Sequence, residues 1–497
     1  MNQIIDLVKK TKVYDVAKKT PLNYIAEFSK QIKNKVYLKR EDMQQIHSFK
    51  LRGAYQKISS LSKKEKKAGI IASSAGNHAQ GVAFAAKKLG INSIIVMPAS
   101  TPEIKVRAVK NLGSKVILHG DIYDEAFKYA KQLEKKYGYT FIHPFDDIEV
   151  IAGQATIAKE IIDTKKNIDY VFVPVGGGGL ISGIGLYIKD ISPKTKIIGI
   201  EPIDSQTLYQ SLHNKQRTIL KEVGGFADGV AVKLIGEHTF NIAKKIVDDI
   251  ILVSNDEICA GIKDIYDNTR SIVEPSGALA LAGAKKYCHE QNLENKNIVA
   301  IVSGANVNFD RLRYIAERAE LGEHKEAIFA VSINEKKGSF LKFCNSLKEY
   351  TITEFNYRYA DKIKAHIFVG IELKQGVNEK NKIIEKLSKD YQLEDMSNNS
   401  IAKTHVRYMV GGRANVKNEE IYRFEFPERR GALLDFLIKI GSKWNITLFH
   451  YRNHGAAFGQ VLVGFQTKNT KELELAFSEL KYFYKNETSN NAYKFFL

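Results

Sequence analysis

The sequence predicts an α/β domain with an open parallel sheet, followed by an α+β domain made of two repeated modules. The chain has 497 residues, more than a single hydrophobic core usually serves, so we expect at least two domains. Between residues 45 and 310, short apolar runs alternate with helical patterns, which is typical of a parallel sheet. After residue 326 this alternation stops and an internal repeat appears.

The expected strands of the first domain are continuous apolar runs, as in strands that are covered on both faces. They lie at 70–72, 93–98, 115–118, 170–175, 196–200 and 298–302. We expect helices over 79–89 and 124–137, since each is followed by a glycine that can end it, Gly90 and Gly138. Ligands in such folds bind beyond the carboxyl ends of the strands.

One segment of this domain resembles a membrane span. Residues 170–188 carry no charge over 19 positions, but they include Pro174 and six glycines, four of them consecutive. A glycine run makes a poor helix and a good turn. We therefore expect a buried strand, a glycine loop and a helix, and no membrane segment.

The repeat of the second domain has an offset of 93 to 94 residues. Glu335, Gly338, Leu341 and Phe343 recur as Glu428, Gly431, Leu434 and Phe436, and Ile352, Thr353, Phe355, Tyr357 and Arg358 recur as Ile446, Thr447, Phe449, Tyr451 and Arg452. Each copy predicts a strand, a turn, a helix and two further strands. We expect a first domain over 1–316, a polar linker over 317–326, and modules over 327–398 and 420–491 that pack as a pair.

Composition narrows the function classes. The formal net charge is +19, which can indicate nucleic-acid binding, but the lysines are spread along the chain and no nucleic-acid motif appears. We expect no nucleic-acid partner and keep a basic nucleic-acid binder as an alternative. Three widely spaced cysteines without a CxxC pair support neither a disulfide framework nor a zinc site and fit a cytoplasmic location.

The first motif, at 47–54, places a lysine between apolar neighbours. Lys50 lies between Phe49 and Leu51 at the start of an expected helix. Burial among apolar side chains lowers the pKa of a lysine, as an imine-forming lysine requires. A solvated lysine is the alternative.

The second motif follows an expected strand and opens a helix. It comprises Ser73, Ser74, Ala75, Gly76, Asn77 and His78. Free backbone N–H groups and the positive end of a helix dipole favour an anion at such a turn. A simple helix cap is the alternative.

Two further motifs follow expected strands. The third consists of Gly176, Gly177, Gly178, Gly179 and Leu180, and such a loop lets backbone N–H groups approach a phosphate. Ser182 stands where G-x-G-x-x-G would need its last glycine, and no Gly-Lys pair exists for a Walker A loop. A phosphate-bearing cofactor is therefore favoured over a dinucleotide or a nucleoside triphosphate. The fourth motif is Ser303-Gly-Ala-Asn-Val at a strand end.

Together the four motifs resemble the fold type II family of pyridoxal-phosphate enzymes. Their order, Ser-Phe-Lys-Leu-Arg-Gly-Ala, Ser-Ala-Gly-Asn-His-Ala-Gln-Gly, Gly-Gly-Gly-Gly-Leu and Ser-Gly-Ala-Asn-Val, is similar to that of the biosynthetic threonine dehydratases. The repeated modules, with Phe-Pro-Glu-Arg-Arg-Gly-Ala-Leu-Leu at 426–434 and Leu-Phe-His-Tyr-Arg-Asn-His-Gly at 448–455, resemble the paired ACT-like regulatory subdomains of that family. The resemblance covers nearly the whole chain.

The resemblance implies a role for each motif. Lys50 would bind pyridoxal phosphate covalently, Phe49 would pack near the cofactor ring, and Asn77 would contact its 3′ oxygen. The backbone of Gly176 to Leu180 would hold the phosphate, and Ser303 would face the pyridine nitrogen. The loop from Ser73 to His78 would receive the substrate carboxylate.

The resemblance also implies an activity and partners. These are deamination of L-threonine, inhibition by isoleucine that valine opposes, and a homotetramer. Tyr357 and Tyr451 would contribute to effector sites. Related racemases use a serine where this chain has Ala75, which favours elimination. They also bind a divalent cation through a Glu and an Asp six residues later, where this chain has Glu201 and Thr207, so we expect no such metal site. A serine dehydratase, and an amino-acid-sensing protein with an inactive catalytic half, remain alternatives.

Overall fold

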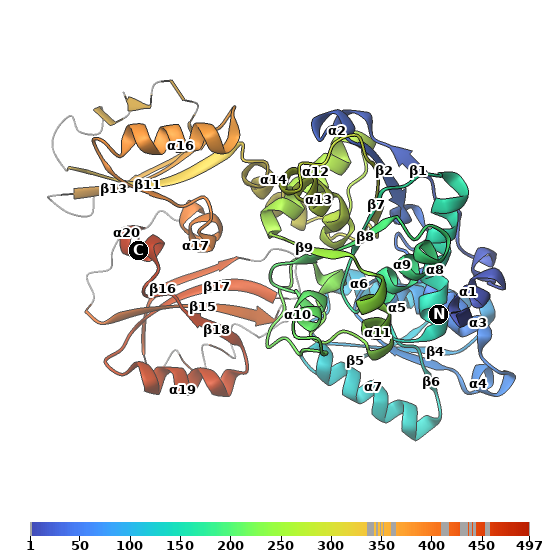
Figure 1. The fold of residues 1–497 in the computed structure, drawn as a ribbon. Coiled ribbons are helices and arrows are strands. Elements are labelled where there is room, and N and C mark those ends of the chain that lie inside the picture. Colours follow the sequence, from blue (N-terminus) through green and yellow to red (C-terminus); the bar gives the residue numbers. More distant parts are fainter. Residues whose placement is uncertain are drawn as a thin grey trace. The chain divides into compact units, whose positions relative to one another are not determined.

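The structure is a computed structural model that forms two compact units, Met1–Ile315 and Ala316–Leu497, here called the N-terminal and C-terminal units (Figure 1). It describes residues 2–334, 342–343, 346–347, 349–350, 352–358, 364–408, 417–427, 436, 440, 444–452 and 458–496.

The larger sheet of the N-terminal unit has six strands in the order β1-β2-β10-β7-β8-β9. They are β1 (Leu22–Tyr24), β2 (Lys35–Arg40), β10 (Asn297–Val302), β7 (Tyr170–Pro174), β8 (Lys196–Pro202) and β9 (Asp249–Val253). Only β1 runs antiparallel to its neighbour; the other pairings are parallel. The carboxyl ends of β2, β7, β8 and β10 therefore lie at one edge.

A second, four-stranded sheet has the order β5-β4-β3-β6 and is parallel throughout. It consists of β3 (Ile70–Ser73), β4 (Ser93–Met97), β5 (Lys115–Leu118) and β6 (Thr140–Phe141). The expected strands are thus present, but in two sheets instead of one. The smaller sheet packs around a separate core, which includes Val82 and Ile95 together with residues of 13–61, whereas the larger sheet packs around the core that includes Val171 and Ile197.

Helices connect and cover both sheets. They are α1 (Asn2–Lys9), α2 (Ala26–Gln31), α3 (Lys50–Ser60), α4 (Lys63–Ala68), α5 (Asn77–Leu89), α6 (Glu103–Asn111), α7 (Tyr123–Tyr137), α8 (Ile148–Thr164), α9 (Gly179–Ile191), α10 (Thr207–His213), α11 (Glu237–Ile246), α12 (Asn255–Thr269), α13 (Pro275–Glu290) and α14 (Arg311–Gly322). Short 3-10 turns are η1 (Val13–Asp15), η2 (Glu41–Met43) and η3 (Asp228–Val230). Gly90 and Gly138 end α5 and α7 with φ values of 65° and 72°, as expected.

Helices α3 and α8 approach each other closely. A Cβ on Gly153 would lie 2.6 Å from the main-chain oxygen of Arg52, and one on Gly53 would lie 2.8 Å from the main-chain oxygen of Val150. Only glycine allows this approach. The contact fixes α3, whose first residue is Lys50.

The uncharged segment 170–188 folds as β7, a glycine loop and most of α9, as predicted. Within the residues that the structure describes, no helix is long and apolar enough to cross a bilayer.

The C-terminal unit contains two antiparallel sheets with the same topology. The first has the order β12-β13-β11-β14 and the second β16-β17-β15-β18. The elements are β11 (Glu326–Asn334), β12 (Ile352–Arg358), β13 (Lys364–Glu372), α16 (Gly376–Leu387), β14 (Gln392–Asp395), α17 (Ser400–Thr404), η4 (Val406–Tyr408), β15 (Glu419–Pro427), β16 (Asn445–Arg452), β17 (Phe458–Gln466), α19 (Thr470–Leu480), β18 (Phe483–Asn486) and α20 (Asn491–Phe496). In Figure 1, α16 and α19 each lie along one face of their own sheet.

Strand register confirms the repeat. Phe355 pairs with Val369 and Phe449 with Val463, and both copies carry an irregularity at the equivalent place, at Ile352/Glu354 and Ile446/Leu448. Each copy also has a helix and a strand that were not expected. Both elements follow Gly370 in the first copy and Gly464 in the second, where the residue matches between the copies end. Repeat positions 335, 338, 341, 428, 431 and 434 lie outside the described residues.

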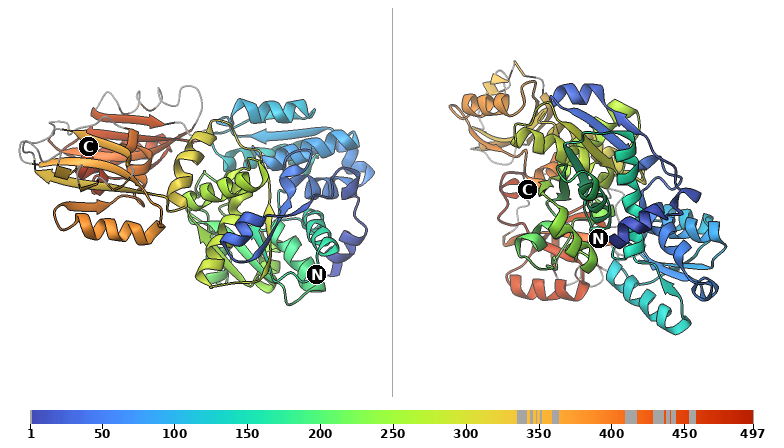
Figure 2. Two further views of the ribbon diagram at one scale, coloured as in Figure 1. Left: turned by 90° about the horizontal axis from the view of Figure 1, so that it is seen from above. Right: turned by 45° about the vertical axis from the view of Figure 1, so that its right-hand side comes forward.

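The two copies pack as a pair, as expected. Ile328 and Phe368 of the first copy share a core with Ile421 and Leu462 of the second, and the two further views in Figure 2 show the two sheets next to each other. The segment expected as a polar linker, 317–326, forms the second half of α14 and reaches the first residue of β11. Its polar residues form a helix because Ile315, Ala319 and Leu321 supply a buried side.

Candidate active site

The first and fourth motifs are joined by main-chain hydrogen bonds. Phe49 N donates to Ser303 O at 3.1 Å, Ala305 N donates to His47 O at 2.9 Å, and Ser48 and Gly304 form an isolated β-bridge. Ser303 directly follows β10. The start of α3 is therefore held at the carboxyl edge of the larger sheet.

The second motif is joined to the fourth through side-chain amides. Asn306 Nδ2 donates to Asn77 Oδ1 at 2.7 Å, and Asn77 Nδ2 donates to Glu274 Oε1 at 2.6 Å. Glu274 Oε2 accepts a hydrogen bond from Asn306 N at 3.1 Å. These three hydrogen bonds connect Asn77 on α5, Asn306 of the fourth motif and Glu274, the residue before α13.

A loop over 143–146 joins the first motif to the third. Lys50 Nζ donates to the main-chain oxygen of Pro144 at 3.2 Å. The next residue, Phe145, packs against the glycine loop, because a Cβ on Gly177 would lie 2.2 Å from its ring and one on Gly179 would lie 3.0 Å from its Cβ. All four motifs thus meet in one region.

The glycine loop has the shape of an anion cradle. Gly178 has a φ of 88°, in the left-handed region that favours glycine, and α9 begins at the next residue. Thr239 Oγ1 donates to Gly177 O at 2.7 Å. The loop can therefore present backbone N–H groups to a phosphate.

The environment of Lys50 lowers the pKa of its amine and so raises the neutral fraction near neutral pH. Burial lowers the pKa of Lys50 to about 8, while the Glu274 carboxylate acts in the opposite direction. The amine lies 5.2 Å from the centroid of the Phe49 ring. A lysine in this state can form an imine, and the alternative of a solvated lysine does not describe it.

The loop from Ser73 to His78 contains both open and buried positions. Ser73 is fully buried, and its hydroxyl has no hydrogen-bond partner in the described part of the chain. A Cβ on Gly76 would meet no atom within 4 Å, so the space beside it is open. The His78 imidazole instead contacts Ile142 O at 2.9 Å, and burial lowers its pKa to about 3, which leaves only the backbone of His78 for an anion.

Ser303 offers a neutral hydroxyl at the same edge. The side chain is 3% exposed, and its Oγ donates to Ser276 O at 3.1 Å. A hydroxyl can both donate and accept, so it can contact a ring nitrogen without contributing a charge.

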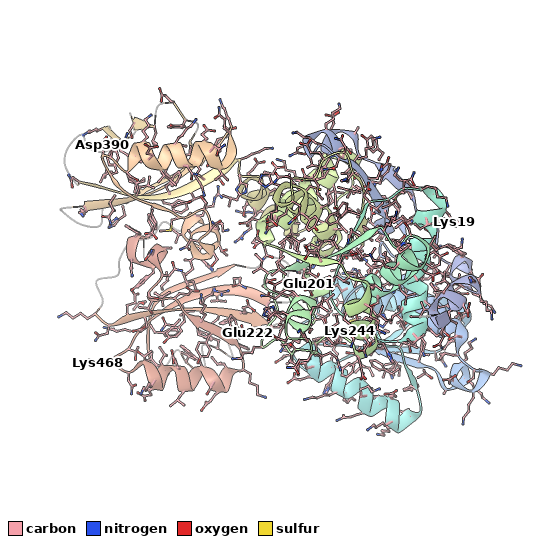
Figure 3. The ribbon with its side chains drawn as sticks, in the orientation of Figure 1. Lys19, Glu201, Glu222, Lys244, Asp390 and Lys468 are labelled. Carbon is pink, nitrogen blue, oxygen red and sulfur yellow. The ribbon has the colours of Figure 1, made fainter. Side chains whose placement is uncertain are left out.

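Glu201 is hydrogen-bonded to the start of α10. Its carboxylate accepts the backbone N–H groups of Leu208 and Tyr209, each at 2.8 Å, and Thr207 Oγ1 donates to Val232 O. Glu201, labelled in Figure 3, therefore stabilises the start of α10. The absence of a racemase-like metal site there stays a prediction.

The two candidate effector tyrosines occupy equivalent strand positions. Tyr357 in β12 pairs with Ile367, and Tyr451 in β16 pairs with Val461. Their side chains lie outside the described residues, so their part in an effector site stays a prediction.

Sequence reasoning missed Glu274. A glutamate before a proline at a helix start has the pattern of an ordinary helix N-terminus, and Glu274 does precede Pro275 of α13. Its other role shows in hydrogen bonds to Asn77, 197 positions away, and to Asn306, 32 positions away, which no local pattern reveals.

Residues 13–304 match the family described as "Pyridoxal-phosphate dependent enzyme", and residues 317–406 and 410–497 match the "C-terminal regulatory domain of Threonine dehydratase". The chain is 52% identical over 502 residues to "L-threonine dehydratase biosynthetic IlvA" of Pasteurella multocida, covering 100% of this chain and 97% of that protein. It is 48% identical over 493 residues to the enzyme of the same name from Escherichia coli, covering 99% of this chain and 96% of that protein.

Solved structures agree with the fold. The processed form of threonine deaminase isoform 2 from Solanum lycopersicum is 49% identical, with a TM-score of 0.63, over 64% of this chain and 88% of that one. Serine racemase from Dictyostelium discoideum is 32% identical, with a TM-score of 0.58, over 62% of this chain and 98% of that one. The expected fold type, cofactor and enzyme class are confirmed. With relatives of about half identity along its full length, and a match to both the cofactor-binding and the regulatory domain, the chain belongs to the family of biosynthetic threonine dehydratases, which are pyridoxal-phosphate-dependent lyases.

Proposed function

We propose that this protein deaminates L-threonine to 2-oxobutanoate and ammonia by β-elimination, the committed step of isoleucine biosynthesis. One observation carries the proposal beyond family membership: Lys50, a lysine of lowered pKa, lies where the four motifs meet. We infer the substrate, L-threonine, from the names of the relatives that match along the full length of the chain.

The residues present fit pyridoxal phosphate, which supplies a carbonyl for the substrate amine and a conjugated ring that accepts electron density from Cα. The glycine loop around Gly178 would hold the phosphate, and Asn77 and Ser303 would contact the 3′ oxygen and the ring nitrogen. Phe49 would pack near the ring. The fit rests on the chemistry of four groups: a glycine loop in which a Cβ would meet neighbouring atoms, an amine of lowered pKa, an amide and a hydroxyl.

Lys50 has two tasks in this proposal. Its amine would hold the cofactor between turnovers, and during turnover the same amine, when free, would remove the Cα proton of threonine. The hydroxyl then leaves Cβ with a proton as water. The released aminocrotonate takes up water and yields 2-oxobutanoate and ammonia, so atoms balance over the cycle.

The surroundings favour elimination over competing reactions. The loop from Ser73 to Gly76, ahead of the N-terminus of α5, would bind the substrate carboxylate. Ala75 offers no group to return a proton to Cα from the opposite face. The neutral Ser303 hydroxyl does not keep a ring nitrogen protonated as an aspartate would, which shortens the time available for transamination.

The regulatory part of the proposal concerns the C-terminal unit. We propose that isoleucine binds there as an inhibitor and valine as its antagonist, with Tyr357 and Tyr451 as contributors. A homotetramer in the cytoplasm is part of the same proposal, and the few cysteines are consistent with that location.

The test is a comparison of kcat/KM for threonine and serine with the cofactor-loaded protein, using Lys50→Ala as the control. We expect threonine to be preferred, 2-oxobutanoate as the product, and activity lower by orders of magnitude in the variant. A preference for serine would favour the serine dehydratase alternative. Binding of both amino acids without turnover would favour the sensing alternative.

A further inference from the structure

We infer that Glu274 is a positioning residue of this active site, which orients the Asn77 amide toward the cofactor and couples its own charge to that of the Lys50 amine. The inference rests on the proposed roles of Asn77 and Lys50.

The first observation is that Glu274 is buried and bonded by neutral donors. Its side chain is 4% exposed. Oε1 accepts from Asn77 Nδ2 at 2.6 Å and from Ser276 Oγ at 3.2 Å, and Oε2 accepts from Asn306 N at 3.1 Å. Burying a carboxylate costs free energy unless such bonds offset it. The burial of Glu274 beside the motif residues therefore suggests a role in the site.

The second observation is that Glu274 fixes the orientation of an amide. Asn77 Oδ1 accepts from Asn306 Nδ2 at 2.7 Å while its Nδ2 donates to Glu274. Turning the Asn77 amide over would place its oxygen against a carboxylate and its NH2 against another NH2. The ionised form of Glu274 can only accept, so it holds Nδ2 toward itself and leaves the second Nδ2 hydrogen for the 3′ oxygen.

The third observation concerns charge. Burial, and then Asp228 on η3, raise the pKa of Glu274 to about 7, against Asn77 on α5, Lys105 on α6 and Ser276 on α13, which lower it. On α3, burial lowers the pKa of Lys50 to about 8, and Glu274 is the charged group that opposes this shift. The negative charge of Glu274 thus acts on the Lys50 amine, and its removal should lower the pKa of Lys50 further.

The glycine contacts show how near Glu274 is to the motif residues. A Cβ on Gly304 would lie 2.5 Å from Glu274 Oε1, and one on Gly229 would lie 3.7 Å from the same atom. The carboxyl group therefore lies between the fourth motif and η3, and Gly304 provides the room for it.

The experiment compares wild type with Glu274→Gln as apoenzymes. The pH dependence of Lys50 labelling by an amine-reactive reagent is followed by peptide mass spectrometry. Loss of the nearby negative charge should lower the labelling midpoint by roughly one pH unit. The affinity for pyridoxal phosphate, measured by binding to the same apoenzymes, should fall about tenfold, because a Gln amide can turn the Asn77 side chain over.

Two further variants keep the result interpretable. Glu201→Gln removes another buried glutamate, whose carboxylate bonds to backbone N–H groups at the start of α10, and it should leave the Lys50 midpoint where it is. Glu274→Asp keeps the charge but shortens the side chain by one methylene. The midpoint of Lys50 labelling should therefore stay near the wild-type value, while the affinity for the cofactor falls. If Glu274→Gln does not fold, Glu274→Asp against wild type still measures the loss of orientation.

An unchanged Lys50 midpoint in Glu274→Gln, or the same shift in Glu201→Gln, would overturn the inference. So would unchanged cofactor affinity in both Glu274 variants. The labelling and cofactor-binding experiments use no substrate. They therefore test the role of Glu274 separately from the proposed threonine specificity, which is tested only by turnover.

Discussion

Lys50 and Phe145 belong to one local arrangement: the Lys50 amine donates to the main-chain oxygen of Pro144 at 3.2 Å, and the adjacent Phe145 ring lies against the glycine loop. The loop over 143–146 therefore contacts both the lysine and the glycine loop proposed to hold the phosphate. Asp146 anchors it from the other side, since its carboxylate accepts the N–H groups of Glu237 at 2.8 Å and Thr239 at 3.2 Å.

Gly177→Ala should weaken cofactor binding. The added Cβ would lie 2.2 Å from the Phe145 ring, and relief of such overpacking typically costs about 1–3 kcal/mol. Titration of the apoenzyme with pyridoxal phosphate measures the effect. Gly225→Ala, where a Cβ meets no atom within 4 Å, should bind as wild type does, and Phe145→Ala in the Gly177→Ala background should restore part of the affinity. Equal affinities for the two single variants would contradict this account of the loop.

Glu160→Gln should strongly destabilise the N-terminal unit. Glu160 is 5% exposed and bonds to two buried cations, Lys39 at 2.5 Å and Arg52 at 2.6 Å. Glu41 also pairs with Arg52 at 2.8 Å and lies 4.0 Å from Lys39, so the change leaves two buried cations with one buried carboxylate. Removing one partner from a buried ionic network typically costs about 3–5 kcal/mol. Urea unfolding provides the measurement.

The matched control for that change lies on the same helix. Asp163→Asn removes an exposed acid that pairs with Lys159, and exposed pairs contribute about 0–1 kcal/mol. If both acid-to-amide changes shift the unfolding midpoint by the same amount, the buried network has no special role.

His78 should make the protein sensitive to acid. Burial lowers its folded-state pKa to about 3, against about 6.5 in the unfolded chain. The unfolded state therefore binds more protons between these values, and the stability that depends on neutral His78 is present above about pH 6.5 and lost as the pH falls toward 3. Between pH 7 and pH 5 the loss is about 2 kcal/mol from this group alone.

The His78→Gln variant tests this linkage. Its amide can still donate to Ile142 O but does not titrate. The difference in unfolding free energy between wild type and variant should change by about 2 kcal/mol between pH 7 and pH 5, in favour of the variant at pH 5. A difference that is the same at both pH values would refute the prediction.

Tyr357→Ala and Tyr451→Ala should weaken inhibition by isoleucine without lowering turnover in its absence. Allosteric coupling is typically ~1–3 kcal/mol, or roughly 5–150-fold in apparent affinity. In the variants, isoleucine should change the apparent affinity for threonine by a smaller factor than in wild type. Isoleucine is titrated at subsaturating threonine, with Tyr137→Ala, an exposed tyrosine of α7, as the control. Variants that respond like wild type would remove the tyrosines from the site; a flat wild-type response with valine also inert would remove the regulatory proposal.

Most of the apolar strands are predicted from the sequence, whereas β2, which ends in charged residues, is not. The apolar β9 and the short β1 and β6 are also not expected. Strands β7 and β10 are nearly uninterrupted apolar runs, so their burial is visible in their composition. Strand β2 ends in Lys39 and Arg40, which resemble surface residues, yet they are 1% and 6% exposed. Their burial depends on partners far along the chain, such as Glu160 for Lys39.

The same limit applies to the site. Lys50, Asn77, the glycine loop and Ser303 could be found because each lies in a motif next to a strand or helix end. Glu274 could not, since its significance lies in contacts with Asn77 and Asn306. Sequence patterns report local structure, whereas this group depends on three distant segments meeting.

The most direct test of the central claim is to reduce the cofactor-loaded protein with borohydride and map the modified peptide. Lys50 is the lysine whose lowered pKa and position among the four motifs suit it to hold the cofactor. The account predicts a single pyridoxyl label, on Lys50, and its absence from Lys50→Ala. A label on any other lysine of the wild-type protein would contradict the account.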